Sequence, residues 1–216
     1  MFDLSLTFDN GPDAAVTPVV LDVLARRGIF STFFVIGMKL ADRHLHRLAA
    51  RARDEGHWIG NHTFSHSVPF GLQRGRAAER EIGQTQDLIA ILAHPDKLFR
   101  PNGGGGVLDR RLLTEPVVTY LTEGQYTCVL WNSIPGDWKD AEGWVDVAIT
   151  QCRMRPWSLM VLHDIPTGAM AHLDGFLEKV VDLGGRFRQE FPPECVPIVR
   201  GDIVLPIEPY VSELHR

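Results

Sequence analysis

Two histidines of this 216-residue chain, His62 and His66, are four residues apart. On a helical turn this spacing places both imidazoles on one face, where they can share a metal ion, although many helices contain the same spacing by chance. Asp9 and the pair His163-Asp164 each end a short apolar segment. A carboxylate can take a proton and an imidazolium can give one, so these groups could act as base and acid in a hydrolysis.

Arg100 and Asp137 extend this set, because each also lies at or just beyond the end of an apolar segment. A guanidinium near Asp9 would keep that carboxylate ionised, and a carboxylate near His163 would favour the protonated imidazole. The remaining histidines have no such neighbours, and we interpret them as surface or structural residues: His44, His46, His57, His94, His172 and His215.

The elements that must position these groups alternate along the chain. Apolar and β-branched segments predict strands at residues 4–8, 31–36, 58–61, 97–100, 127–132 and 158–163. Amphipathic segments predict helices from Thr17-Pro18 to Gly28 and at residues 42–55, 76–93, 109–123 with a kink at Pro116, 141–154 and 169–183. This alternation is typical of an α/β fold with a parallel sheet, either a barrel or an open sheet, whose functional groups lie at the carboxyl ends of the strands. We expect one domain over residues 1–216, with an irregular, proline-rich final segment of the chain.

Composition excludes several classes of protein. The formal net charge of −5 argues against nucleic acid as a partner, and no apolar run is long enough to span a membrane. The three cysteines are widely spaced and fit reduced thiols better than a disulfide framework. The first residues show no basic stretch followed by an apolar one, so we expect a cytoplasmic protein.

Six segments resemble, in order, the motifs of polysaccharide deacetylases (carbohydrate esterase family 4), the group that contains chitin, chitooligosaccharide and peptidoglycan deacetylases. The segments are Thr7-Phe8-Asp9-Asn10-Gly11-Pro12, Thr32-Phe33-Phe34-Val35-Ile36-Gly37, Gly60-Asn61-His62-Thr63-Phe64-Ser65-His66, Arg100-Pro101, Asp137-Trp138 and Leu162-His163-Asp164. The resemblance implies a distorted (β/α) barrel with fewer than eight parallel strands. It also implies a divalent metal, most often zinc, at the positions of Asn10, His62 and His66.

The same resemblance implies a role for each remaining motif residue. Asp9 would be the general base, oriented by Arg100, and His163 the general acid, with its pKa tuned by Asp137. The residues expected to wall the substrate pocket or to serve the oxyanion are Trp138, Leu162 and the backbone N–H of Gly103.

The chain departs from the family pattern, notably at residue 10 and at residues 102–104. Asn10 stands where the family has a metal-binding Asp, and a neutral amide oxygen binds a metal less tightly than a carboxylate does. Asn102-Gly103-Gly104 replaces P-[YF]-G, which predicts the loss of an aromatic wall. The glycines at 103–106 lack the G-K-[ST] of a phosphate loop and predict a flexible loop, and Trp131 is assigned to the core.

These observations favour a metal-dependent hydrolase that removes an acetyl or another small acyl group from the amide nitrogen of an N-acylated sugar. The expected partner is an N-acetylated oligosaccharide or a small amide. Two alternatives remain open: a metal-free amidohydrolase acting on another C–N bond, as relatives that hydrolyse allantoin do, and a carbohydrate-binding relative with weak catalysis. The oligomeric state has no signature in the sequence.

Overall fold

A computed structural model describes residues 1–212 of the chain, and within that range one nine-stranded sheet organises the fold. The strands follow the order β6-β1-β2-β3-β4-β5-β8-β9, and β7 pairs with β1 as well. Their bounds are β1 Phe2–Asp9, β2 Thr32–Val35, β3 Trp58–Asn61, β4 Leu98–Phe99, β5 Thr127–Cys128, β6 Trp157–His163, β7 Gly185–Arg188, β8 Ile198–Val199 and β9 Asp202–Ile203.

Strands β1 to β7 run parallel, whereas β8 and β9 are antiparallel to their neighbours. The sheet curls until the segment after β5 reaches β6. There Ser133 forms a parallel bridge with Met160, and the Val161 N–H donates to the Ser133 carbonyl at 3.0 Å. The expectation of a distorted barrel with fewer than eight parallel strands is therefore confirmed.

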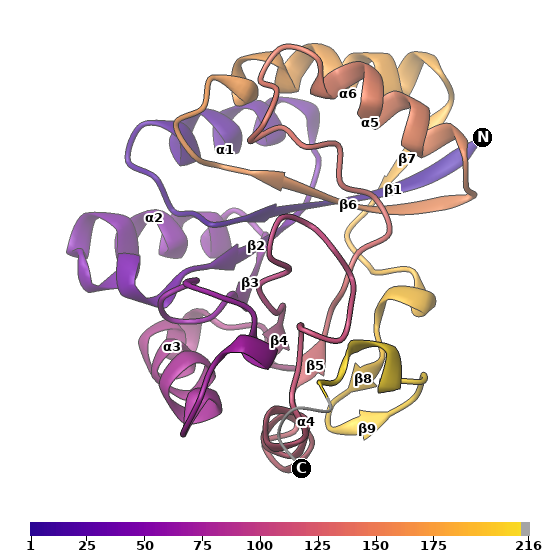
Figure 1. Cartoon of the computed structure of the whole chain (residues 1–216). Coiled ribbons are helices and arrows are strands. Elements are labelled where there is room, and N and C mark those ends of the chain that lie inside the picture. Colours follow the sequence, from indigo (N-terminus) through magenta and orange to yellow (C-terminus); the bar gives the residue numbers. More distant parts are fainter. Residues whose placement is uncertain (213–216) are drawn as a thin grey trace.

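Helices cover the outside of this sheet (Figure 1). Helices α1, α5 and α6 lie against β1 and β6, α2 and α3 flank the middle strands, and α4 lies near β5. Their bounds are α1 Val16–Arg27, α2 Arg43–Asp54, α3 Gln84–Ile89, α4 Glu115–Glu123, α5 Trp144–Arg153 and α6 Leu173–Asp182. Within residues 1–212 no helix combines the length and the apolar character that a bilayer crossing requires.

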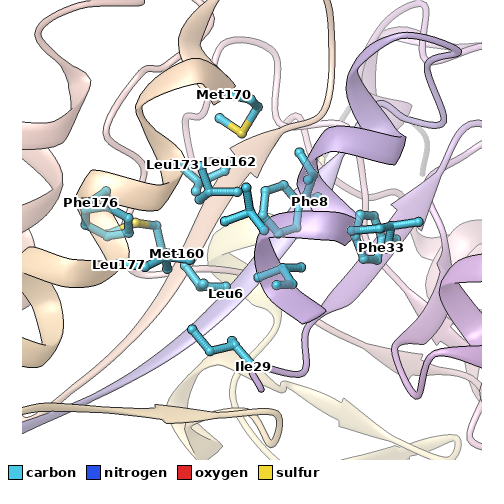
Figure 2. Close-up of a cluster of buried hydrophobic side chains, with 14 of the residues drawn as sticks. Leu6, Phe8, Ile29, Phe33, Met160, Leu162, Met170, Leu173, Phe176 and Leu177 are labelled. Atoms are coloured by element: carbon cyan, nitrogen blue, oxygen red, sulfur yellow. The ribbon is translucent and has the colours of Figure 1, made fainter. Parts of the chain in front are cut away.

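Side-chain alternation along the strands separates the core from the site. In β1, Leu4, Leu6 and Phe8 face the helices and are at most 2% exposed. They pack with apolar residues of β6 and α6, as Figure 2 shows for Met160, Leu162, Phe176 and Leu177. Because successive side chains of a strand point to opposite faces, Thr7 and Asp9 point into the barrel. Strand β1 therefore contributes to the core on one face and places Asp9 in the site on the other.

Several predicted elements differ from the observed ones. Strands β4 and β5 are two residues long each, shorter than the predicted segments 97–100 and 127–132. The predicted helix 76–93 is divided into a π-helix Glu79–Gly83, α3 and a 3-10 turn Ala90–Leu92. Pro116 stands in the first turn of α4, where its missing N–H costs nothing, and does not kink a longer helix.

Two further differences lie at the chain's first helix and last segment. Thr17 does not cap α1: the cap position is Ala15, and the Thr17 hydroxyl instead donates to Asp164 at 2.5 Å. The final segment, predicted to be irregular, contributes β7 beside β1 and the β8–β9 hairpin beside β5. Short strands at the edge of a sheet lack the alternating pattern that identifies longer ones.

Candidate active site

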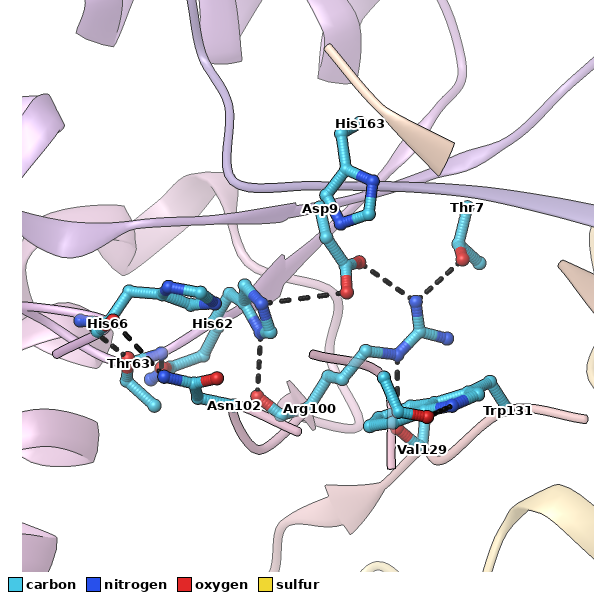
Figure 3. Close-up of polar contacts among 12 residues, drawn as sticks. Thr7, Asp9, His62, Thr63, His66, Arg100, Asn102, Val129, Trp131 and His163 are labelled. Atoms are coloured by element: carbon cyan, nitrogen blue, oxygen red, sulfur yellow. Dashed lines mark hydrogen bonds and ion pairs between the residues drawn. The ribbon is translucent and has the colours of Figure 1, made fainter. Parts of the chain in front are cut away.

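A buried ion pair between Asp9 and Arg100 lies at the centre of the site (Figure 3). Arg100 Nη1 is 2.8 Å from Asp9 Oδ1 and donates to the Thr7 hydroxyl at 2.6 Å. The guanidinium also donates to the carbonyl oxygens of Val129 and Leu130 at 3.2 Å each. The structure thus brings together the two residues that the sequence paired, and it also anchors the arginine to the segment that follows β5.

The charge state of Asp9 follows from these contacts. Burial by itself would raise the pKa of this carboxyl, since Asp9 is only 3% exposed. The positive charge and hydrogen bond of Arg100, together with the neighbouring imidazoles, outweigh that effect and lower the pKa below its ordinary value. Asp9 is therefore a carboxylate at neutral pH. Arg100, which is fully buried and lies over the Phe34 ring at 4.1 Å, cannot easily move away from it.

His163 lies beside Asp9 on the neighbouring strand and has its own carboxylate partner. His163 Nδ1 is 2.9 Å from Asp137 Oδ1, and the His163 backbone N–H donates to Asp137 Oδ2 at 2.8 Å. Burial by itself would lower the pKa of His163, but the hydrogen bond to Asp137 and its negative charge outweigh burial and raise the pKa. Trp138 packs edge-on against this imidazole, with the ring centroids 4.8 Å apart.

The histidine pair His62 and His66 follows β3 on the other side of Asp9, with ring centroids 4.7 Å apart. The two residues occupy a tight loop in this structure, not the helical turn that their spacing suggested. Burial lowers the pKa of both imidazoles, that of His66 to about 3, so both are neutral at neutral pH. His62 Nδ1 lies 2.9 Å from the Arg100 carbonyl oxygen, which can only accept, so this nitrogen carries the proton.

The remaining nitrogen of His62 therefore carries a lone pair, and it lies 3.5 Å from Asp9 Oδ2. Asn10 adds another acceptor close by: its Oδ1 is buried and has no hydrogen-bond partner among the described residues. Asn10, His62 and His66 line the same pocket as Asp9. Within residues 1–212 no group of three or more His, Cys, Asp or Glu side chains is arranged as a metal site.

The pocket itself has a volume of about 180 Å³. Its lining includes Trp138 and Gly103, as the sequence suggested, but it does not include Leu162. Leu162 belongs to the helix-facing core, and the placement predicted for it is wrong. Because side chains alternate along β6, the residues that reach the pocket are Val161 and His163.

The Trp131 indole supplies an aromatic wall next to Gly103, where the sequence predicted that such a wall would be missing. A Cβ atom at Gly103 would lie 2.5 Å and 2.6 Å from two atoms of the Trp131 indole, so this ring packs directly on the glycine backbone. The indole Nε1 donates to the Gly106 carbonyl at 3.2 Å, and the ring lines the pocket. The assignment of Trp131 to the core is confirmed, and the same ring also lines the pocket, where Gly103 leaves room for it.

The family resemblance assigned no specific role to two acidic residues at the edges of the site. Glu81 is buried and accepts hydrogen bonds from the loop that carries His62 and His66. Asp164 is fully buried against Gly11 and accepts from Thr17, and burial raises its pKa to about 7. Asp164 was indicated by its place beside His163 at the end of an apolar segment, whereas Glu81 had no signal because it falls within the predicted helix 76–93. His215 lies outside the described residues.

Comparisons with known proteins agree with this geometry. The family model described as polysaccharide deacetylase matches residues 3–117. The chain is 33% identical over 176 residues to a chitooligosaccharide deacetylase of Sinorhizobium fredii, covering 78% of this chain and 75% of that protein. It is 28% identical over 189 residues to a peptidoglycan-N-acetylglucosamine deacetylase of Bacillus cereus, covering 86% of this chain and 66% of that one.

The solved structures give the same answer. A family 4 carbohydrate esterase from Streptomyces lividans in complex with acetate superimposes with a TM-score of 0.73 at 26% identity, covering 93% of this chain and 98% of that one. The family model spans more than half of this chain, and the curled parallel sheet agrees with the likeness to this esterase. The chain therefore belongs to the polysaccharide deacetylase family.

Proposed function

We propose that this chain is a divalent-metal-dependent hydrolase that removes an acetyl group from the amide nitrogen of an N-acetylated sugar. The observation that carries the proposal is the position of Asp9 and His163 on paired residues of neighbouring strands, each with its own buried partner and both lining one pocket. The similarity to chitooligosaccharide and peptidoglycan deacetylases supports the choice of an acetylated amino sugar as substrate.

The reaction needs a nucleophilic water, a stabilised oxyanion and a proton for the leaving amine. Asp9 accepts a proton from the water that adds to the acetyl carbonyl carbon, and Arg100 holds its carboxylate in place. His163 in its imidazolium form donates a proton to the nitrogen as the C–N bond breaks, leaving acetate and a free amine. The Gly103 N–H lies on the pocket wall and is a candidate donor to the oxyanion.

The donors of a divalent metal in this proposal are Asn10, His62 and His66. Their fit rests on chemistry: the unprotonated nitrogen of His62 lies next to a carboxylate, and the buried Asn10 oxygen in the same pocket has no donor among the described residues. A bound divalent metal polarises the carbonyl and lowers the pKa of water, so a weakly basic carboxylate suffices as the base. Zinc suits two imidazoles and an oxygen.

The test is to strip the purified protein of metal, add zinc and supply chitopentaose, measuring released acetate and free amine together. We expect the two products in equal amounts, dependent on zinc and abolished in Asp9→Asn. Equal turnover with and without metal would favour the metal-free amidohydrolase. Binding of the oligosaccharide without either product would favour the weakly catalytic binding protein.

A further inference from the structure

The loop that carries His62 and His66 has a backbone that its own residues do not favour. Thr63 has a φ of 65° and His66 a φ of 51°, and neither residue is glycine. This left-handed region is sparsely populated by residues with a Cβ atom, above all by β-branched ones such as threonine. Contacts from outside the loop must therefore hold it in this conformation.

Glu81 supplies the contacts to the two residues between these strained positions. One carboxylate oxygen, Oε2, accepts from the backbone N–H groups of Phe64 at 3.1 Å and Ser65 at 2.8 Å. The other, Oε1, accepts from the Ser65 hydroxyl at 2.8 Å. Glu81 is only 3% exposed, so these three donors take the place of water around its carboxylate.

The secondary structure around Glu81 is itself unusual. Residues Glu79–Gly83 form a π-helix directly before α3, a feature that is rare and often found at functional sites. The next residue, Ile82, accepts at its carbonyl from the Asn61 side-chain amide at 2.9 Å, while Asn61 Oδ1 accepts from the Thr63 N–H at 3.1 Å. The same short segment is thus linked to the histidine loop in two ways: directly through the Glu81 side chain, and through the Ile82 carbonyl by way of Asn61.

We propose that Glu81 is a positioning residue for the His62–His66 pair: by binding the Phe64 and Ser65 amides it holds both imidazoles toward the pocket. It touches neither imidazole and acts only through the loop. The expected effect of Glu81 on metal affinity rests on the proposed function. The effect on the loop conformation does not, because the loop has this geometry without a metal. A purely structural role would affect the stability of the fold and leave the relation between the two imidazoles unchanged.

The experiment compares three variants with the wild type. Glu81→Ala removes both acceptor oxygens and with them all three hydrogen bonds. Glu81→Gln keeps the shape and one acceptor oxygen for the two amides, while its NH₂ group can donate to the Ser65 hydroxyl. Glu79→Ala is the matched control, since Glu79 is an exposed glutamate of the same π-helix. Each metal-stripped protein is titrated with zinc by calorimetry, its melting temperature is recorded, and amide exchange and the contact between the two imidazole rings are followed by NMR.

We expect Glu81→Ala to bind zinc about 10- to 100-fold more weakly, which is the usual effect of losing a group that orients metal ligands. Glu81→Gln should recover most of the affinity, and Glu79→Ala should match the wild type. In the metal-free proteins the Phe64 and Ser65 amides should exchange faster in Glu81→Ala, and the contact between the two imidazole rings should be lost.

Two outcomes would overturn the inference. The first is wild-type zinc affinity in Glu81→Ala, whatever happens to its melting temperature. The second is an unchanged contact between the two imidazole rings in metal-free Glu81→Ala. If the wild type binds no zinc, the proposed metal-dependent function fails, and the NMR comparison alone still decides the role of Glu81.

Discussion

Asp9 and His163 are paired residues of the neighbouring parallel strands β1 and β6. Side chains at paired positions point to the same face of a sheet, so both enter the barrel interior at its carboxyl end. Each has a partner that reaches it from another segment, Arg100 for the carboxylate and Asp137 for the imidazole. The register of two strands thus places a carboxylate and an imidazole, both with shifted pKa values, side by side on one pocket wall.

Replacing Asp9 by Asn should lower turnover by roughly 10²- to 10⁴-fold, because the base is removed. It should also lower stability by about 3 to 5 kcal/mol, since the fully buried Arg100 loses its one carboxylate partner among residues 1–212. Acetate release and chemical denaturation measure the two effects. Asp3→Asn is the control on the same strand, because Asp3 pairs with arginines of β7 away from the pocket. Full activity of Asp9→Asn would remove Asp9 from the mechanism.

The pH–rate profile should report His163. As the acid it must be protonated, so kcat should fall as pH rises through its raised pKa. Asp137→Asn removes the charge that raises this pKa, and the alkaline limb should move to lower pH. Asp146→Asn, an exposed carboxylate on α5, should leave the limb in place. An alkaline limb that does not move in Asp137→Asn would point to a different acid.

Stability should depend on pH through the same pair. The folded-state pKa of His163 is raised above its unfolded value, so its contribution is fully present below about pH 6.5 and is lost as pH rises through the folded pKa. Denaturant titrations at a series of pH values should show this loss in the wild type. In Asp137→Asn the dependence over that window should be smaller, and an identical dependence would argue against the pairing in solution.

Asn10→Asp should tighten zinc binding, because a carboxylate replaces a neutral amide oxygen among the proposed donors. Calorimetric titration of zinc into the metal-stripped wild type and variant gives the comparison directly. Turnover can change in either direction, since a more negative site holds the metal better but also reduces its positive charge. Equal affinities would mean that residue 10 does not contact the metal.

Gly103→Ala should disturb the pocket wall, since its Cβ would approach the Trp131 indole to 2.5 Å. Displacing the ring should cost about 1 to 3 kcal/mol of stability and weaken substrate binding. Gly175→Ala is the control, because nothing lies within 4 Å of the added Cβ in α6, and there the change should stabilise by about 0.5 to 1 kcal/mol. Unchanged stability and KM in Gly103→Ala would show that Trp131 moves away freely.

Much of the site could be predicted because the signals are local. Alternation of strands and helices indicated a parallel sheet, either a barrel or an open sheet, and polar residues at strand ends indicated where its chemistry would lie. The resemblance to polysaccharide deacetylases then paired Asp9 with Arg100 and His163 with Asp137, and the structure brings both pairs together. Their catalytic and metal-binding roles stay predictions until they are measured.

What only the tertiary structure decided depends on contacts between segments far apart in the chain. The Trp131 indole takes the space above Gly103 because two loops meet there, and neither residue indicates this by its type. Glu81 reaches the histidine loop because a π-helix replaces part of a predicted regular helix, and the periodicity of apolar residues cannot reveal so local a change. The sequence by itself determined which groups reach the mouth of the barrel, since strand ends and alternation are local properties. The packing of the loops decided which of these groups contact one another, because such contacts depend on the path of the whole chain.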